Sequence, residues 1–334
     1  FFHLNLRPDI IRNHNLEHAR KLATQSTLAK LSKLARIALL DQHFRMTRIL
    51  RNIRSLLALV AFLSIQAISQ AETPESIAEK IRKEYSSGDK NKALKLAAEG
   101  IKKHPKDYTL LTIRGRIYEE ENQHAEAEND YTNVLIKNKT DAGIYHRRGV
   151  VRFFQLKFND SLADFDKFIE MVPSQEPYHW QRGLVHYYAG KYKAGRKQFE
   201  VHQTVNSQDV ENAVWHYLCI AKTDGTKKAE ENFIKITSDR RVPLKEIHAL
   251  FAGKGTEQQV LDAIIAGNPN PNALTRNQFY GHLYLGLYFE AQNKPNKAAK
   301  YINLAAKDHK SHGYMGQVAR VHNEWLKQKS NQPK

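Results

Sequence analysis

Residues 114–131 read RGRIYEEENQHAEAENDY, residues 148–165 read RGVVRFFQLKFNDSLADF, and residues 182–199 read RGLVHYYAGKYKAGRKQF. Each stretch opens with an Arg-Gly pair and closes, sixteen residues after the glycine, with an aromatic residue. The three openings are 34 residues apart. A fixed period of this length indicates helical hairpins that stack side by side into a solenoid. We therefore expect a chain that presents an extended surface rather than one that encloses a catalytic pocket.

The unit over residues 108–141 shows how such a stretch forms two helices. Leu111 and Gly115 are four apart and share one face of the first helix, as Ala127 and Tyr131 do on the second. Because Gly115 has no side chain, a neighbouring helix can approach it closely. The pattern predicts a helix–turn–helix hairpin in each period.

Further units flank these three. Residues 74–107 have Ile81 in place of the glycine, and a last unit contains Gly286. The interval between Gly183 and Gly286 is long enough for about two more hairpins that have lost the pattern. A capping helix over Gly313–Trp325 is expected to cover the end of the solenoid, which would otherwise expose apolar surface. The predicted segments are four regular units over 72–208, degenerate hairpins over 209–278, a last unit with its capping helix over 279–326, and a tail over 327–334.

Residues 74–208 and 279–312 resemble tetratricopeptide repeat (TPR) units, since several positions of the repeat recur together. The resemblance implies an all-α solenoid, a right-handed superhelix with a concave groove. The order of segments, with Phe279-Tyr280-x4-Leu285-Gly286 in the last unit, is also similar to bacterial envelope TPR proteins of the NlpI lipoprotein type. That second resemblance implies an adaptor whose partner is an envelope hydrolase or protease.

The first 71 residues differ in composition, with 11 Lys/Arg against 3 Asp/Glu. Residues 46–71 read MTRILRNIRSLLALVAFLSIQAISQA, in which three arginines precede an apolar run and Ser69 and Ala71 are small. This pattern predicts a secretory signal peptide cleaved after Ala71, and hence export to the periplasm or cell envelope. We expect Met46 to be the start and residues 1–45 to be a non-native upstream extension. The alternatives are an uncleaved signal anchor and a basic transit peptide over 1–71.

Charge and cysteine content limit the partners. Residues 72–334 carry 41 Lys/Arg and 32 Asp/Glu, a net charge of +9 compared with +17 for the whole chain. The excess favours acidic partners, but the basic residues are scattered among acids, whereas nucleic-acid binders gather them on one face. We expect no nucleic-acid partner. Cys219 is the only cysteine, so no lipid-modified cysteine follows the cleavage site, and membrane attachment is expected only through an uncleaved signal segment.

A concave groove formed by the first helices of the units is the predicted binding site. Aromatic residues accompanied by arginine are typical of binding hot spots. The competing interpretation is that Phe153 and Tyr187, which neighbour core positions, belong to the core. The predicted groove residues are Arg116, His146, Arg147, Phe153, Phe154, Trp180, Tyr187, Tyr188, Tyr280 and Tyr284.

The arginines that precede the three glycines have a structural explanation. Sixteen residues after each arginine, on the next helix, comes a residue that can accept its hydrogen bonds. Arginine and carboxylate form strong paired hydrogen bonds. For the first two we therefore predict pairs between the helices of a hairpin rather than a ligand site, Arg114 with Asp130 and Arg148 with Asp164. At the third, the residue that stands opposite Arg182 in this spacing is Gln198.

Other motifs point away from catalysis. Residues 252–256 read AGKGT, but the spacing is not that of a phosphate loop. Gly253 is expected to end one helix, and Thr256 with Gln259 to form the capping box of the next. His309 and His312 could hold a surface metal ion, yet no further ligand pattern accompanies them.

We therefore predict a non-enzymatic scaffold that binds a protein or peptide, with no catalytic residues, metal or cofactor. Two alternatives differ in class. One is a structural envelope protein that self-associates as a homodimer through residues 209–278. The other is a histidine-based metal protein or enzyme.

Overall fold

The computed structural model describes residues 8–69, 72–307 and 313–330, and every regular element in these ranges is helical. The chain divides between Glu72 and Thr73 into two compact units. An all-α fold is thereby confirmed for the described part of the chain.

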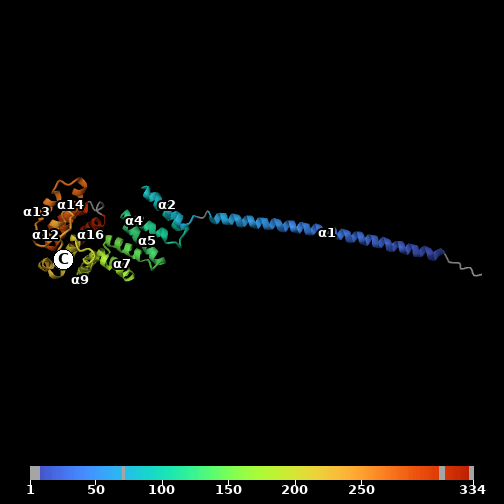
Figure 1. Cartoon of the computed structure of the whole chain (residues 1–334), viewed down its shortest axis with the longest axis horizontal. Helices are drawn as coiled ribbons and strands as arrows, with labels where there is room; N and C mark the ends of the chain where they lie inside the picture. The colour runs from blue at the N-terminus through green and yellow to red at the C-terminus, as the bar shows by residue number, and fades with distance from the viewer. Residues whose placement is uncertain (1–7, 70–71, 308–312, 331–334) are drawn as a thin grey trace, which may run out of the picture. The chain divides into compact units, whose positions relative to one another are not determined.

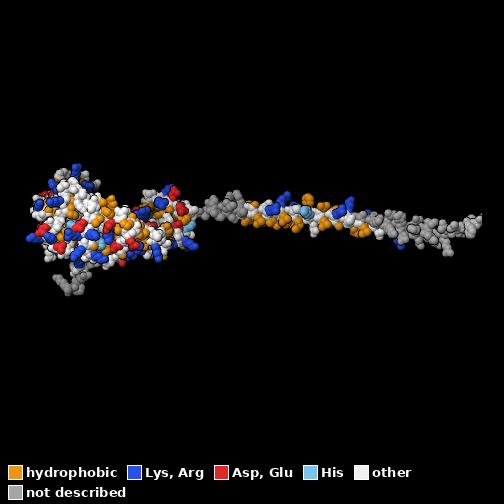
Figure 2. Space-filling model, turned by 60° about the horizontal axis from the view of Figure 1, so that its bottom comes forward, with side chains coloured by type: hydrophobic (Ala, Val, Ile, Leu, Met, Phe, Trp, Pro, Cys, Tyr) orange, Lys and Arg blue, Asp and Glu red, His pale blue; other side chains and the backbone are white. Residues whose placement is uncertain are grey.

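The first unit is dominated by one uninterrupted helix, α1 (Pro8–Ser69), which contains residues 8–45 of the predicted upstream extension and most of the predicted signal peptide. Large apolar side chains between Leu28 and Val60 are exposed along it, with Lys and Arg side chains among them (Figure 2). Within the described residues, no helix has the length and apolarity that a membrane span requires. The predicted cleavage point after Ala71 lies outside the described residues.

The regular part of the second unit is a series of helix pairs joined by short turns (Figure 1). A short 3₁₀ segment, η1 (Pro173–Tyr178), separates the last two pairs. The pairs are α2 (Pro74–Ser86) with α3 (Lys90–Lys103), α4 (Thr109–Glu120) with α5 (His124–Lys137), α6 (Ala142–Phe154) with α7 (Phe158–Met171), and α8 (Trp180–Tyr188) with α9 (Tyr192–His202).

Helices of more variable length follow. Gly253 has a positive φ of 69° at the end of one of them, and Thr256 and Gln259 form the predicted capping box at the start of the next. The helices are α10 (Val210–Asp224), α11 (Thr226–Glu231), α12 (Leu244–Phe251), α13 (Glu257–Ile265), α14 (Pro271–Ala291), α15 (Pro295–Lys307) and α16 (Gly313–Ser330).

The repeated glycines fit against the repeated aromatic rings. A Cβ atom added to Gly149 would lie 2.6 Å from ring carbons of Phe165, and one added to Gly183 would lie 2.7 Å from Phe199. Such distances are too short for carbon atoms in contact, so only glycine lets the two helices pack at this spacing. Gly115 has the same relation to Tyr131, at 2.8 Å.

Two other units follow the rule with different residues. In the last unit, a Cβ atom at Gly286 would lie 2.6 Å from Ile302, again sixteen residues further along the chain. In the first repeat, formed by α2 and α3, Ile81 occupies the glycine position and Ala97 the aromatic position, and both are fully buried. The large and small residues are exchanged there, so the volume at the helix contact is retained.

The predicted arginine pairs are confirmed. Asp130 accepts two hydrogen bonds from Arg114, at 2.8 and 2.7 Å. Asp164 accepts from Arg148 at 2.9 and 2.7 Å, and the Gln198 side-chain carbonyl accepts from Arg182 at 2.9 Å. These arginines hold the two helices of each hairpin together and are not free for a ligand.

Helix α16 departs from the expectation. It packs against α15, as a capping helix would, but it also contacts α6, which belongs to the third unit. Val318, Val321 and Trp325 join the largest hydrophobic cluster, which extends from α6 to the end of the chain. The helix also runs to Ser330, into the segment predicted as a tail. Helix α16 therefore packs against the last unit and also against the third.

Candidate binding pocket

Aromatic contacts bring the start of α16 onto the predicted groove face. The ring of Tyr314 lies 5.0 Å from that of Phe154, 5.0 Å from that of Trp180 and 6.2 Å from that of Phe153, measured between centroids. Rings at these separations attract one another beyond their burial of apolar area. Further along α16, Trp325 packs edge-on against Tyr188 at 5.3 Å.

Polar contacts tie the same helix to four distant segments. Gln317 donates to the Asn122 side-chain carbonyl at 2.6 Å, and Arg320 donates to the backbone carbonyl of Phe154 at 2.5 Å. His322 lies with Nδ1 3.0 Å from the Tyr188 hydroxyl and with Nε2 3.0 Å from a carboxylate oxygen of Glu290.

Glu290 in turn accepts from Lys222 at 2.7 Å. Burial alone would raise the pKa of Glu290, but His322 and Lys222 outweigh it and lower that pKa to about 2. The carboxylate therefore stays charged at neutral pH and anchors α16 to α10 and α14.

Burial by α16 and by the core corrects part of the predicted groove. Phe153, Tyr187 and Tyr284 are 0% exposed, and Phe154 and Tyr188 are buried as well. These five side chains are core residues in this structure, and no partner can reach them without rearrangement. The burial of Phe153 and Tyr187 agrees with the competing interpretation that they belong to the core.

The remaining predicted residues have different environments. His146 packs among the rings of Phe165, Phe168 and His179, within 6 Å of each. Arg147 donates to Glu119 at 3.1 Å. Arg116 is exposed, and Tyr280 is half-buried and stacks on Tyr284. Of the ten, Trp180 is the residue that lines the pocket described next.

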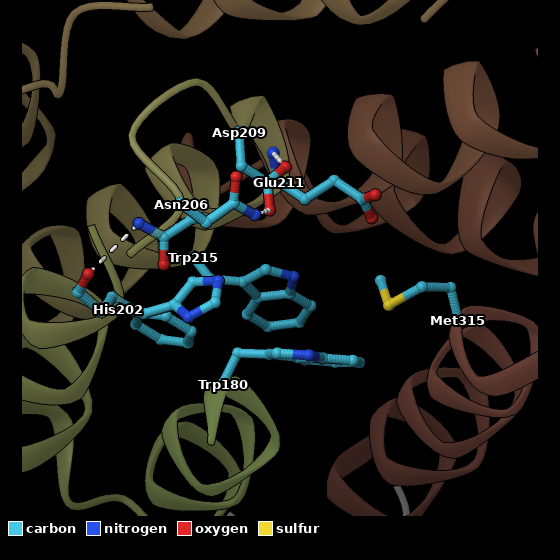
Figure 3. Close-up of a pocket in the computed structure, with 9 residues that line it drawn as sticks. Trp180, His202, Asn206, Asp209, Glu211, Trp215 and Met315 are labelled. Atoms are coloured by element: carbon cyan, nitrogen blue, oxygen red, sulfur yellow. Dashed lines mark hydrogen bonds between the residues drawn. The ribbon is translucent and has the colours of Figure 1, made fainter. Parts of the chain in front are cut away.

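A cavity of about 220 Å³ remains between α8, α9, α10 and α16 (Figure 3). We call it the Trp180–Trp215 pocket. Trp180 forms its floor in the view of Figure 3, Trp215 lies above, and Met315 of α16 closes one side. Its lining consists of Trp180, Phe199, His202, Asn206, Asp209, Glu211, Asn212, Trp215 and Met315.

The polar wall follows from local sequence at the start of α10. Asp209 caps the helix by accepting from the backbone N–H of Glu211 at 3.1 Å, and it also accepts from Asn206 at 3.2 Å. Glu211 and Trp215 are four residues apart, which places both on one face of α10. The cap and this spacing together turn two carboxylates and an indole toward one cavity.

Carboxylates outnumber their cationic partner at this wall. The Arg241 guanidinium contacts Asp209 at 2.6 Å, Glu211 at 2.5 Å and Asp239 at 2.6 Å. Glu211 also accepts from the hydroxyl of Tyr284. Burial raises the pKa of Glu211, and Arg241 opposes the rise. The cluster of three carboxylates and one guanidinium carries an excess of negative charge when ionised.

Two buried polar atoms at the pocket have no hydrogen-bond partner within the described residues. They are Nε1 of Trp215 and the side-chain oxygen of Asn212, on side chains that are 2% and 3% exposed. In Figure 3 the indole nitrogen of Trp215 points toward the side of the cavity where Met315 and Glu211 lie. An unpaired buried donor or acceptor is costly, so such an atom at a cavity wall is a candidate partner for a ligand.

Sequence reasoning missed most of this lining because it followed the repeat register. The signal that could have found it is the run Asn206 to Trp215, in which a capping aspartate, a glutamate and a tryptophan follow at helical spacing. It falls at the border of the segment predicted as degenerate. Met315 comes from α16, whose position was not predicted.

The hypothesis of a metal at His309 and His312 concerns residues outside the described ranges. The described residues hold no group of three or more His, Cys, Asp or Glu side chains that could hold a metal ion.

A family model described as "Tetratricopeptide repeat" matches residues 79–142. Among solved structures, a tetratricopeptide repeat protein from Parabacteroides merdae is 19% identical, with a TM-score of 0.51 over 76% of this chain and 98% of its own. MamA is 15% identical (TM-score 0.45, 48% of this chain and 88% of that one). YrrB, titled a TPR protein with an unusual peptide-binding site, is 12% identical (TM-score 0.37, 68% and 97%).

The sequence match, the helix pairs and the glycine contacts agree with one another. Proteins of this kind generally serve as scaffolds for protein interaction. Residues 79–142 match the tetratricopeptide repeat model, and the described helices have an all-α fold similar to that of a solved tetratricopeptide repeat protein.

Proposed function

We propose that this chain is a non-enzymatic scaffold of the cell envelope that binds a segment of a partner protein at the Trp180–Trp215 pocket. The observation that carries the proposal is the unpaired Nε1 of the buried Trp215 at the wall of a cavity with aromatic and carboxylate sides. Aromatic residues in desolvated pockets dominate the binding energy of protein interfaces.

The size of the pocket limits what can enter it. At about 220 Å³ it is smaller than the roughly 300–1,000 Å³ of sites that hold drug-sized ligands. One amino-acid side chain with its adjoining peptide group fits this volume. A protein segment that inserts one residue is therefore favoured over a free cofactor.

The envelope location and the partner's class rest on the sequence. The signal-peptide pattern of residues 46–71 supports export, and the similarity of segment order to NlpI-type lipoproteins supports an envelope hydrolase or protease as the partner. N-terminal sequencing of the chain isolated from cells tests export. A mature start at Glu72 supports it, and retention of residues 46–71 in a cytoplasmic fraction contradicts it.

Site-specific photocrosslinking in cells tests the binding site. A photoreactive residue replaces Asn206, which is exposed and lines the pocket, or Ile136, which is exposed on α5 away from it. We expect a discrete protein adduct from position 206 and none of that size from position 136. The adduct should disappear when Trp180→Leu is added. Equal adducts at both positions, or no adduct at 206, would contradict the proposal.

A further inference from the structure

We infer that the Trp180–Trp215 pocket takes a basic side chain, lysine or arginine, from an extended peptide segment whose backbone carbonyl accepts a hydrogen bond from Trp215. This inference rests on the proposed function and adds the chemistry of the residue that is recognised. Three independent features of the pocket lead to it.

The first feature is the excess of carboxylates. Arg241 is the cation in contact with Asp209, Glu211 and Asp239, so the cluster is two negative charges in excess when all four groups are ionised. Ionised carboxylates accept at about four lone-pair sites each. The contacts found here leave sites open on Asp209 and Glu211, both of which line the pocket. A second cation at this wall would complete the pairing that Arg241 begins.

The second feature is the aromatic floor. In Figure 3 the Trp180 indole is seen edge-on, with one face turned toward the cavity. Its edge-to-face contact with Tyr314, at 5.0 Å and 77°, fixes this orientation. A cation over the face of a tryptophan is attracted by the ring, most strongly when water is excluded. The methylene stem of a lysine or arginine would also pack against Met315 and the rings.

The third feature distinguishes a peptide from a free organic cation. Trp215 Nε1 is a donor, so it requires an acceptor that a bare ammonium group lacks. A peptide carbonyl next to the basic side chain supplies that acceptor.

The charges next to the pocket, rather than the net charge of the chain, determine which peptide is preferred. Residues 72–334 carry +9, which repels a basic peptide at long range. At physiological ionic strength, charges more than about 8 Å apart on the surface are largely screened. Carboxylates that touch the bound side chain therefore determine which peptide is preferred.

The three tryptophans of the chain allow a direct titration. The full chain is labelled with ¹⁵N-tryptophan, and the indole resonances of Trp180, Trp215 and Trp325 are followed while capped tripeptides are added. The probes are acetyl-Ala-X-Ala-amide with X as lysine, arginine, norleucine or glutamate. We expect the lysine and arginine peptides to shift the resonances of Trp180 and Trp215, while that of Trp325, which belongs to α16 and is buried against Tyr187 and Tyr188, stays unchanged. The norleucine peptide should bind at least about ten-fold more weakly than the lysine peptide, and the glutamate peptide should not bind.

A pair of glutamate variants provides a matched control. Glu211 and Glu257 each accept from a tyrosine hydroxyl and pair with a basic residue, Tyr284 and Arg241 in one case and Tyr301 and Lys297 in the other. Only Glu211 lines the pocket. Glu211→Gln should weaken the lysine peptide about ten-fold, and Glu257→Gln should leave it unchanged. If Glu211→Gln lowers Tm by more than Glu257→Gln does, a second pair of variants, Trp180→Phe and Trp180→Leu, is compared for binding of the lysine peptide. We expect Trp180→Phe to retain binding and Trp180→Leu to lose it.

Different outcomes separate the two claims. Shifts of Trp180 and Trp215 by the norleucine or glutamate peptide at equal or higher affinity would overturn the basic specificity and leave peptide binding intact. Shifts by spermidine at lower concentration than the lysine peptide would overturn the peptide requirement. The absence of shifts with every probe would overturn both this inference and the proposed pocket.

Discussion

The hydroxyl of Tyr188 lies 3.0 Å from Nδ1 of His322, although 134 residues separate the two along the chain. This contact joins the fourth repeat to the last helix. Because His322 also contacts Glu290, α16 is bound both to α8 and to α14. The chain thus fills part of its predicted groove with its own C-terminal helix, and the site left for a partner is the Trp180–Trp215 pocket.

Gly149→Ala tests the glycine contact. The added methyl group would lie 2.6 Å from Phe165, which is fully buried, so the helices must separate. Overpacking costs about 1–3 kcal/mol, against a gain of up to about 1 kcal/mol in helix propensity. We expect a net loss of about 1–2 kcal/mol in the free energy of unfolding, measured by urea denaturation. Gly143→Ala is the control on the same helix, where the nearest atom would lie 3.4 Å away, and it should be neutral or stabilising.

Asp164→Ala tests the arginine pairs. Asp164 accepts from Arg148 and from Arg152, and its loss leaves two largely buried guanidinium groups without this partner. Removal of one member of a buried ion pair costs roughly 3–5 kcal/mol. Glu170→Ala removes an exposed pair with Lys167 and should cost less than about 1 kcal/mol. Equal costs for the two variants would show that the first pair is not structural.

Trp325→Ala tests the docking of α16. Trp325 is buried against Tyr187, Tyr188 and His322. Truncation of a buried tryptophan costs about 3–5 kcal/mol. Tyr178→Ala changes an exposed aromatic residue in η1 and should change stability by no more than about 0.5 kcal/mol. A Trp325→Ala variant as stable as the parent would mean that α16 is not docked in solution.

Acid sensitivity follows from four histidines, of which His179 and His186 are buried and His124 and His146 are half-buried. Burial lowers the pKa of His124, His146 and His186 to about 4, and burial with the charge of His146 lowers that of His179 to about 3. In the unfolded chain these groups titrate near 6.5. Between pH 6.5 and about 4 the unfolded chain therefore binds more protons, so stability should fall as the pH is lowered through this window. Above about pH 7.5 all four are almost entirely neutral in both states and contribute little pH dependence.

His179→Asn isolates one of these groups. His179 caps α8 by accepting from the backbone N–H of Arg182 at 3.2 Å, and asparagine is an equally good cap that does not titrate. Each unit of pKa difference corresponds to about 1.4 kcal/mol of stability. The variant should lose less unfolding free energy than the parent between pH 7.5 and pH 4.5. The same loss in both chains would show that His179 is not held neutral by the fold.

The fold was predictable where contacts repeat at a fixed spacing. Gly149 and Phe165, or Arg148 and Asp164, lie on adjacent helices of one hairpin, so a local pattern records their contact. The sequence left open whether Phe153 and Tyr187 belong to the core, and the burial of Phe154 and Tyr188 beside α16 could not be predicted. Tyr314 and His322 lie far along the chain from Phe153 and Tyr188, and no periodic pattern links them. The acidic wall was overlooked for a related reason, since Arg241 approaches Asp209 from beyond the next hairpin.

The most direct test of the account asks whether a partner binds while α16 stays docked. Asn122→Cys and Gln317→Cys, whose parent side chains are in contact, are joined by a short reducible bis-maleimide linker, while the buried Cys219 is left in place. Adduct formation from the photoreactive residue at position 206 is then compared before and after reduction. The account predicts the same adduct yield in both forms, because the pocket lies beside the docked helix. An adduct that appears only after the linker is cleaved would contradict the account and show that the partner takes the place of α16.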